Sequence, residues 1–576
     1  MTQVQGFIDK VAFIWSVADL LRGDYKAHEY GQVILPLTVL RRLDCVLKST
    51  RPAVIARAAD LAGKIENVEP ILLRAAGQPF YNTSPLDFAR LLDDPGNVAG
   101  NLRTYIAGFS TGAVEVLDRY GFDNQITRLD NAGLLFHVVS RFADVDLHPD
   151  TVPNDAMGYI FEELLRKFSE MSNETAGEHF TPREVIRLMV NILFSEDDDL
   201  LRGGSPVRTM FDCACGTGGM LTGGQDHLTS LNPKARLEVF GQELNPETWA
   251  IARSDLMIKG QDPARIRLGN SLSADEFAGK RFDYMIANPP FGVDWKRIQK
   301  QLTDEHTQLG HNGRFGAGLP RVNDGSLLFL QHLMSKMKPA FEGGSRIAIV
   351  FSGSPLFSGA AASGESDIRR WIIDNDMLEA VVGLPDQLFY NTGINTYFWV
   401  VTNRKANHRK GKVVLLDARG EWAKMRKSLG DKRKYLTDEH VEQVTRLYHE
   451  AIDTDDERVK VFDNDAFGYQ RINVERPKIG EDGQPQRNRR GRVPDPDLRD
   501  NENVPLSEDV GDYMKREVLP HVPDAWVDTT KTKIGYEIPF TRYFYRDVPP
   551  RPLVEIDADL AQIEAEIQQV LQRVTS

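Results

Sequence analysis

Short apolar runs alternate with segments of helical periodicity through the middle of the chain. Each run is long enough for one strand and ends at or near Gly, Asp or Asn. The runs are Thr209 to Asp212, Leu237 to Gln242, Phe282 to Ala287, Arg346 to Phe351, Glu379 to Gly383, Thr396 to Val401 and Lys412 to Leu416. Strands that alternate with helices imply a largely parallel, doubly wound sheet. We therefore expect an α/β domain over residues 169–480.

The segments on either side of this region have different sequence patterns. From Gly6 to about Phe168 the apolar residues recur at helical spacing, which predicts an all-α domain over residues 1–168. Past Gly480 the chain is polar and rich in Pro and Gly, so residues 481–576 should begin with a linker. They should end in a helix whose apolar residues are spaced four, three, four, three: Ile556, Leu560, Ile563, Ile567 and Val570. This helix could pack on its own domain or on a partner.

Charge and composition limit the partners that the chain can bind unaided. The 576 residues carry a formal net charge of −13, which argues against a protein that holds nucleic acid by bulk positive charge. Any DNA contact must use local basic patches or a partner. The three cysteines do not form a zinc motif, and we predict no metal site. No apolar run approaches the roughly 18 residues of a membrane span, so we expect a cytoplasmic protein without membrane contact.

A glycine-rich turn follows the first predicted strand of the sheet. After Asp212 come Gly216, Thr217, Gly218 and Gly219, and glycines at such a place let the backbone turn tightly and approach a ligand closely. No Gly-Lys-Ser/Thr follows, which excludes a Walker A loop and disfavours ATP. The turn predicts a nucleotide-like ligand, although an ordinary tight turn has the same residues.

The second predicted strand leads into an acidic residue. Glu243 follows this strand, where a carboxylate can accept hydrogen bonds from the two hydroxyls of an adenosyl ribose. A surface acid would be the alternative. The position of Glu243 at the end of the second strand favours the role in ribose binding.

The most specific motif is Asn288-Pro289-Pro290-Phe291, at the end of a predicted strand. Two consecutive prolines remove two backbone donors and fix two φ angles, which leaves a rigid loop. The Asn288 side-chain oxygen and the Pro289 carbonyl can accept hydrogen bonds from an amine on a planar ring, and Phe291 can stack on that ring. In a duplex the adenine N6 is hidden, so the base must be flipped out. Catalysis would then come mainly from positioning the amine, without a covalent enzyme intermediate.

These motifs resemble those of the modification subunits of type I restriction-modification systems, which are adenine-N6 DNA methyltransferases of the gamma class. The resemblance implies a Rossmann-like fold that binds S-adenosyl-L-methionine. It assigns the methionine part of this cofactor to a motif ahead of the glycine-rich strand, and the cofactor adenine to a second motif. The first comprises Glu178, His179, Phe180, Thr181, Pro182 and Arg183, and the second Asn270, Ser271 and Leu272. Asn270 stands where the family often has Asp.

The resemblance also implies an assembly. Two modification subunits would join one DNA specificity subunit on double-stranded DNA, and a restriction subunit would join when the complex cleaves. Sequence choice would then reside outside this chain. Among the alternatives, cytosine-N4 enzymes more often have Ser in place of Asn288, and RNA or protein amine methyltransferases usually lack the long helical domain. A non-catalytic scaffold of a defence complex is the alternative from another class.

Two basic stretches could contact DNA. Between the Asn-Pro-Pro-Phe loop and Asp324 lie several cations that could belong to a mobile loop or to a solvated surface: Lys296, Arg297, Lys300, Arg314 and Arg321. Residues 403–412 read NRKANHRKGK, which is more typical of an exposed turn than of a DNA contact.

Overall fold

A computed structural model describes residues 10–171, 181–197, 201–429, 431–481, 483–489, 491–545 and 552–575. Two compact units make up the chain, Met1–Ile538 and Pro539–Ser576. Among the described residues no helix combines the length and the apolar character that a bilayer crossing needs.

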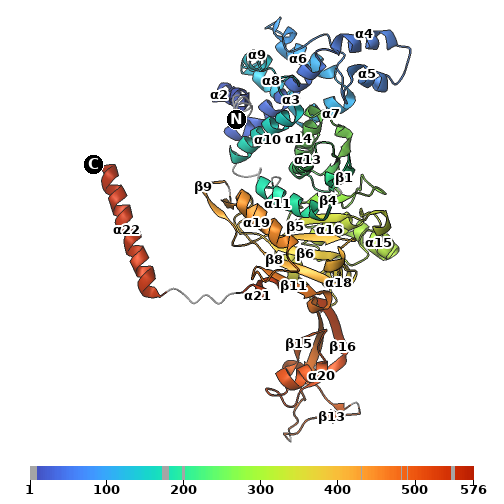
Figure 1. Ribbon diagram of the computed structural model, residues 1–576, viewed down its shortest axis with the longest axis vertical. Coiled ribbons are helices and arrows are strands. Elements are labelled where there is room, and N and C mark those ends of the chain that lie inside the picture. The colour runs from blue at the N-terminus through green and yellow to red at the C-terminus, as the bar shows by residue number, and fades with distance from the viewer. Residues whose placement is uncertain are drawn as a thin grey trace. The chain divides into compact units, whose positions relative to one another are not determined.

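The first part of the large unit is a set of helices, as the periodicity predicts (Figure 1). Its centre is α3, which is buried along most of its length and contacts α8, α9 and α10. The helices are α2 (Val17–Leu21), α3 (Gly31–Leu47), α4 (Arg51–Leu61), α5 (Glu69–Ala76), α6 (Val98–Ala107), α7 (Thr111–Arg119), α8 (Phe122–Asn131), α9 (Leu135–Ala143) and α10 (Asn154–Met171).

A nine-stranded sheet follows, in the order β11-β8-β6-β7-β5-β4-β1-β2-β3. Its strands are β1 (Val207–Asp212), β2 (Arg236–Glu243), β3 (Ile266–Leu268), β4 (Tyr284–Ala287), β5 (Arg346–Phe351), β6 (Leu378–Gly383), β7 (Tyr397–Thr402), β8 (Lys412–Asp417) and β11 (Val459–Asp463). All neighbours are parallel except β7, which is antiparallel to β5 and β6, and β11, which is antiparallel to β8. The predicted α/β sheet is confirmed. Its strand order reverses between β1 and β4, where ligands bind in such sheets.

Helices pack on this sheet and join it to the N-terminal helices (Figure 1). They are α11 (Arg183–Phe194), α13 (Gly219–Leu231), α14 (Pro246–Ile258), α15 (Gln299–Leu309), α16 (Ser326–Met334), α17 (Ser354–Phe357), α18 (Gly364–Asp374) and α19 (Asp438–His449). Helix α14 contacts α3, α7 and α10, and Arg253 in α14 pairs with Glu115 in α7 at 3.0 Å. The helical domain therefore packs directly against the sheet domain.

A buried ion pair joins the middle strands of the sheet. Both oxygens of Glu379 in β6 accept from Arg346 in β5, at 3.0 and 3.1 Å, and Arg346 also donates to Tyr448 of α19 and to the Leu193 carbonyl of α11. Both charged side chains are almost fully buried. This cluster fixes two helices on the sheet, and its burial leaves it no access to water.

Two further structures complete the large unit. A hairpin of β9 (Ala423–Leu429) and β10 (Lys432–Tyr435) precedes α19. After it comes a sheet in the order β15-β12-β16 and a short pair of strands, with α20 (Val510–Tyr513) beside them. Their bounds are β12 (Gly468–Glu475), β13 (Arg487–Asn488), β14 (Gly491–Arg492), β15 (Asp500–Pro505) and β16 (Trp526–Tyr536).

The prediction of a linker after Gly480 is wrong for this sheet. Ile472, Val474 and Val504 are buried with Met514 and Val518 in a small core of their own, although the intervening sequence is polar and rich in Pro and Gly. The paired residues of strands β12 and β16 are more than fifty positions apart in the sequence, so no local sequence pattern predicts this sheet. The large unit continues to Ile538.

The small unit contains α21 (Phe540–Tyr543) and the predicted tail helix α22 (Leu553–Thr575). Several large apolar side chains of α22 are exposed, namely Leu553, Val554, Ile556, Leu560, Ile563 and Ile567. Four of the five positions of the predicted seam, Ile556, Leu560, Ile563 and Ile567, are thus exposed.

Candidate active site

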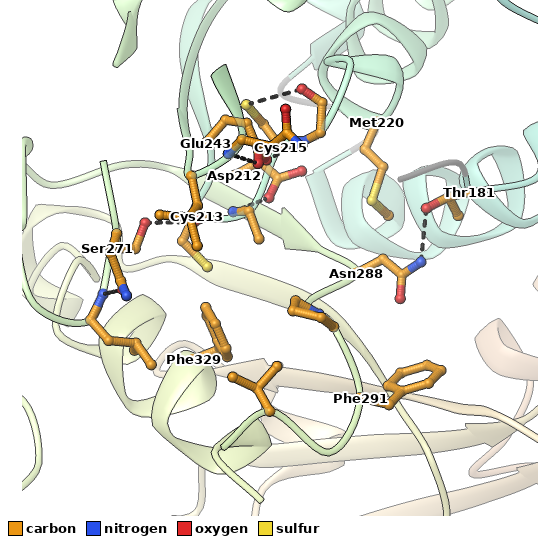
Figure 2. A pocket seen from close by; sticks show the side chains of 18 of the residues that line it. Thr181, Asp212, Cys213, Cys215, Met220, Glu243, Ser271, Asn288, Phe291 and Phe329 are labelled. Atoms are coloured by element: carbon orange, nitrogen blue, oxygen red, sulfur yellow. Dashed lines mark hydrogen bonds between the residues drawn. The ribbon is translucent and has the colours of Figure 1, made fainter. Parts of the chain in front are cut away.

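A cavity of about 1070 Å³ lies at the carboxyl ends of β1, β2 and β4 (Figure 2). Its lining brings together most of the residues that the sequence singled out: Thr181, Asp212, Gly216, Thr217, Gly219, Glu243, Asn270, Ser271, Leu272, Asn288, Pro290 and Phe291. These residues come from five separate segments of the chain. The sheet gathers them because strands that run in parallel end at one edge.

The glycine-rich turn between β1 and α13 has the backbone that its glycines suggest. Gly216 and Gly218 have φ angles of +53° and +83°, in the left-handed region that favours glycine. Gly218 caps α13, and the Cys215 amide donates to the Gln242 carbonyl at 3.1 Å, which joins the turn to β2. The amide of Gly216 is held by Glu243, whose Oε2 accepts from it at 2.8 Å.

Two buried carboxylates face this cavity without a cationic partner among the described residues. Glu243 accepts from the amides of Gly216 and Asn245, and Asp212 accepts from the amide of Ala214 at 2.9 Å. The pKa of Asp212 is raised to about 8, mainly by burial and also by the neighbouring charge of Glu243, against one backbone hydrogen bond that lowers it. The two acids suit a ligand that offers hydroxyl donors and positive charge.

The segment Asn270–Leu272 forms another wall of the cavity. The Ser271 hydroxyl donates to the Cys213 carbonyl at 2.6 Å, and Asn270 Oδ1 accepts from the Leu272 amide at 2.9 Å. Arg314 donates to the Ser271 and Leu272 carbonyls at 2.9 and 2.8 Å, and it pairs with Glu305 of α15 at 2.7 Å. Arg314 therefore supports the wall from behind. The sequence left it among several candidate DNA contacts, and only its side-chain contacts reveal this structural use.

The Asn-Pro-Pro-Phe loop leaves β4 and borders the same cavity. Asn288 Nδ2 donates to Thr181 Oγ1 at 3.0 Å, and the amide oxygen points away from Thr181 (Figure 2). Pro289 is buried, Pro290 is exposed, and Phe291 is half-buried. The acids gather at one side of the cavity in Figure 2 and Phe291 lies at the other.

The motif ahead of the glycine-rich strand is described in part. Glu178, His179 and Phe180 lie outside the described residues. Thr181 and Pro182 immediately precede α11, and Arg183, its first residue, pairs with Glu162 of α10. The motif thus borders the cavity at Thr181, and its hydroxyl contacts the Asn-Pro-Pro-Phe loop.

The two basic stretches have different roles in the fold. In the run NRKANHRKGK, Arg404 pairs with Asp197, Lys405 pairs with Asp376 at 2.6 Å, and Arg409 is buried against Tyr448. The interpretation of an exposed turn is wrong for these three side chains, which neutralise acids inside the domain. Lys296, Arg297 and Lys300 are exposed, and Arg297 lines the cavity.

The strand order and the acidic, glycine-lined cavity at its reversal define the class of S-adenosylmethionine-dependent methyltransferases. The profile of the N-6 DNA Methylase family matches residues 152–474, more than half of the chain, and that of the HsdM N-terminal domain matches residues 11–142. The chain belongs to the N-6 DNA methylase family.

Individual relatives agree with this assignment. The methylase subunit of the type I restriction enzyme MjaIX from Methanocaldococcus jannaschii is 25% identical over 461 residues, which cover 77% of this chain and 78% of that one. The EcoKI methylase subunit of Escherichia coli K12 is 26% identical over 354 residues, 57% of this chain and 60% of that one. In fold, the chain is similar to a type I restriction-modification methyltransferase subunit from Streptococcus thermophilus, with a TM-score of 0.61, 21% identity and coverage of 80% and 96%.

The predicted activity is therefore confirmed at the level of the family. The chain is an adenine-N6 DNA methyltransferase of the type I modification-subunit kind, with S-adenosylmethionine as its cofactor. Cytosine, RNA or protein methylation and a scaffold role are not favoured. The cavity fits this cofactor, because two buried carboxylates without cationic partners among the described residues suit its ribose hydroxyls and positive charges.

Proposed function

We propose that this cavity binds the cofactor and the target base side by side, each through its own set of residues. Glu243 would hold the ribose, Asn270 to Leu272 the adenine of the cofactor, and Asp212 with the turn Gly216–Gly219 its amino-acid part. The motif that runs from Glu178 to Arg183 would complete the methionine end. When bound, the cofactor supplies a methyl group on a positively charged sulfur.

The Asn-Pro-Pro-Phe loop would bind the flipped adenine. Asn288 Oδ1 and the Pro289 carbonyl would accept the two hydrogens of the N6 amine, and Phe291 would stack on the ring. Two acceptors on one amine fix its lone pair in direction and stabilise the positive charge that grows on nitrogen as it is methylated. No side chain has to form a covalent bond with the base.

The observation that carries this proposal is the hydrogen bond from Asn288 Nδ2 to Thr181. An amide that donates through nitrogen to a fixed hydroxyl must present its oxygen elsewhere, and here the oxygen belongs to a residue that lines the cavity. Thr181 would thus be a positioning residue for Asn288 in addition to its expected place beside the cofactor.

We also propose the assembly that the relatives suggest. One structure that is similar in fold, with a TM-score of 0.51 and 21% identity, is described in terms of complex assembly and conformational transition of the type I system. Double-stranded DNA, a DNA specificity subunit and a restriction subunit would be the partners, with two modification subunits for each specificity subunit. The sheet part would then carry out catalysis, and the helical part and the tail would serve assembly. The exposed apolar residues of α22 would dock on the specificity subunit.

The test separates cofactor binding from methyl transfer in two variants. Asn288→Ala should lower transfer from labelled cofactor to DNA about 100-fold or more while the cofactor dissociation constant stays within about threefold. Asn270→Ala should do the reverse and weaken cofactor binding about tenfold, with transfer recovered at saturating cofactor. Equal loss of binding in both variants would contradict the separation of the two subsites.

A further inference from the structure

The hairpin of β9 and β10 is the most basic exposed element beside the cavity. Residues 423–435 contain six Lys and Arg and one Asp, in a chain whose net charge is −13. A chain of this charge needs local basic patches to approach DNA. The fold itself neutralises some of these cations.

Two of the cations anchor the hairpin to the body of the domain. Lys432 is buried, donates to the Leu388 carbonyl at 2.8 Å and pairs with Glu184 of α11 at 2.5 Å. Lys434 pairs with Asp386 at 2.5 Å and lies over the Trp422 ring. The charges of Lys432 and Lys434 are therefore neutralised by acids of the same domain.

Two of the four remaining cations, Lys424 and Arg426, lie on one side of β9. Lys424 and Arg426 are exposed while Ala423 and Met425 are half-buried, so the two cations point to the same side of β9. Lys424 lies opposite Lys434, next to the point where the register of the hairpin becomes irregular. Asp386 compensates the charge of Lys434, so the charges of Lys424 and Arg426 are the ones left for a ligand. Lys424 and Arg426 are exposed, and among the described residues no carboxylate lies within ion-pair distance of either. This face is suited to a ligand with repeated negative charge.

The turn end of the hairpin is attached to a segment that leads into the wall of the cavity. The amides of Asp431 and Arg433 donate to the carbonyls of Tyr390 and Gln387, at 3.0 and 2.9 Å. The chain then runs directly into Asn391, Thr392 and Ile394, which line the cavity. Glu184, the partner of Lys432, is three residues from Thr181. The hairpin is therefore held by the same segments that border the proposed base pocket.

We propose that the β9–β10 hairpin grips the phosphate backbone of the DNA duplex beside the flipped adenine, through Lys424 and Arg426. The inference rests on the proposed function, since the duplex must lie against the mouth of the cavity when one of its bases enters. Contacts to phosphate carry no sequence information, so the hairpin would position the duplex without choosing the site. An acidic surface on a protein partner is the rival occupant.

The experiment uses the full chain assembled with its specificity subunit and unmethylated genomic DNA. Initial rates of methyl transfer are measured against DNA concentration at several salt concentrations for the wild type, K424Q/R426Q and K424E/R426E. The control K460E/K533E reverses two exposed lysines elsewhere, for which no ion pair is seen among the described residues. Cofactor affinity and the urea midpoint verify that each variant is folded.

In both hairpin variants the slope of log affinity against log salt should fall by about 2, since each lost phosphate contact removes about 0.9. The KM for DNA should rise about tenfold at physiological salt, and kcat at saturating DNA should stay within about twofold. The control should match the wild type. An unchanged slope and KM in folded variants would overturn the proposal, as would loss of the specificity subunit from the complex with no change in the slope.

A failure of the proposed function is distinguishable from this result. If the wild type transfers no methyl group, the function is in error, and the hairpin is judged from equilibrium binding of the same DNA by anisotropy. There the salt slope of the hairpin variants must again fall by about 2 relative to the control. A slope equal to that of the control contradicts the hairpin contact in either assay.

Discussion

Thr181 and Asn288 are 107 residues apart in the chain, yet their side chains share a hydrogen bond at the edge of the cavity. Thr181→Val keeps the shape of the side chain and removes the acceptor, so the Asn288 amide loses the contact that fixes its orientation. At saturating cofactor, where any loss of cofactor affinity is overcome, we expect kcat to fall about tenfold to 100-fold. Thr181→Ser should restore most of the rate. An unchanged kcat at saturating cofactor in Thr181→Val would contradict the positioning role.

The raised pKa of Asp212 predicts that the free energy of unfolding depends on pH. Its pKa is about 8 in the folded, ligand-free chain and 3.8 as an ordinary side chain, because burial disfavours its charge. The folded state thus keeps a proton that the unfolded state releases, and the stability from this group falls as the pH rises from about 4 to about 8.

Asp212→Asn stays neutral throughout this range. In urea unfolding without cofactor, the variant should therefore gain stability relative to the wild type between pH 5 and pH 8. Cofactor binding at pH 8 should be weaker in the variant, since the negative charge is then lost. An identical difference in unfolding free energy at both pH values would show that Asp212 does not titrate in this range.

At the scale of secondary structure, the Arg346–Glu379 pair joins β5, β6, α11 and α19. Glu379→Ala leaves a buried guanidinium without its partner, so the free energy of unfolding should fall by about 3–5 kcal/mol. The control is Asp60→Ala, which breaks exposed pairs with Arg57 and Lys64 and should cost under about 1 kcal/mol. Urea unfolding monitored by circular dichroism measures both. Equal small losses would mean that the cluster contributes specificity of packing and little stability.

The strands and the cavity were predictable because their signals are local. Asp212 and Asn288 each stand at the end of an apolar run, and parallel strands bring such ends together. Arg314 and Arg404 were not separable from surface cations, since only the fold reveals the carbonyls and acids that they meet. The β12–β16 sheet escaped prediction because its pairing spans a long polar insertion.

At the scale of the whole molecule, the small unit should be dispensable for cofactor binding. Removal of residues 552–576 deletes α22, while every described residue that lines the cavity lies in the large unit. We expect unchanged cofactor affinity and loss of co-purification with the specificity subunit. The control replaces Glu555 and Asp559 of the helix by Gln and Asn, and it should leave assembly intact, since apolar area drives docking. Retention of the subunit by the truncated chain would place the contact elsewhere.

The central claim is that this cavity methylates the N6 amine of adenine in DNA through the loop at Asn288. Its most direct measurement is transfer of an isotopically labelled methyl group from the cofactor to DNA, in the presence of the specificity subunit, followed by mass spectrometry of the digested nucleosides. The wild type should place the label on N6-methyladenine alone, and Asn288→Ala should leave no label above background. Label on cytosine, RNA or protein, or undiminished label with Asn288→Ala, would contradict the account.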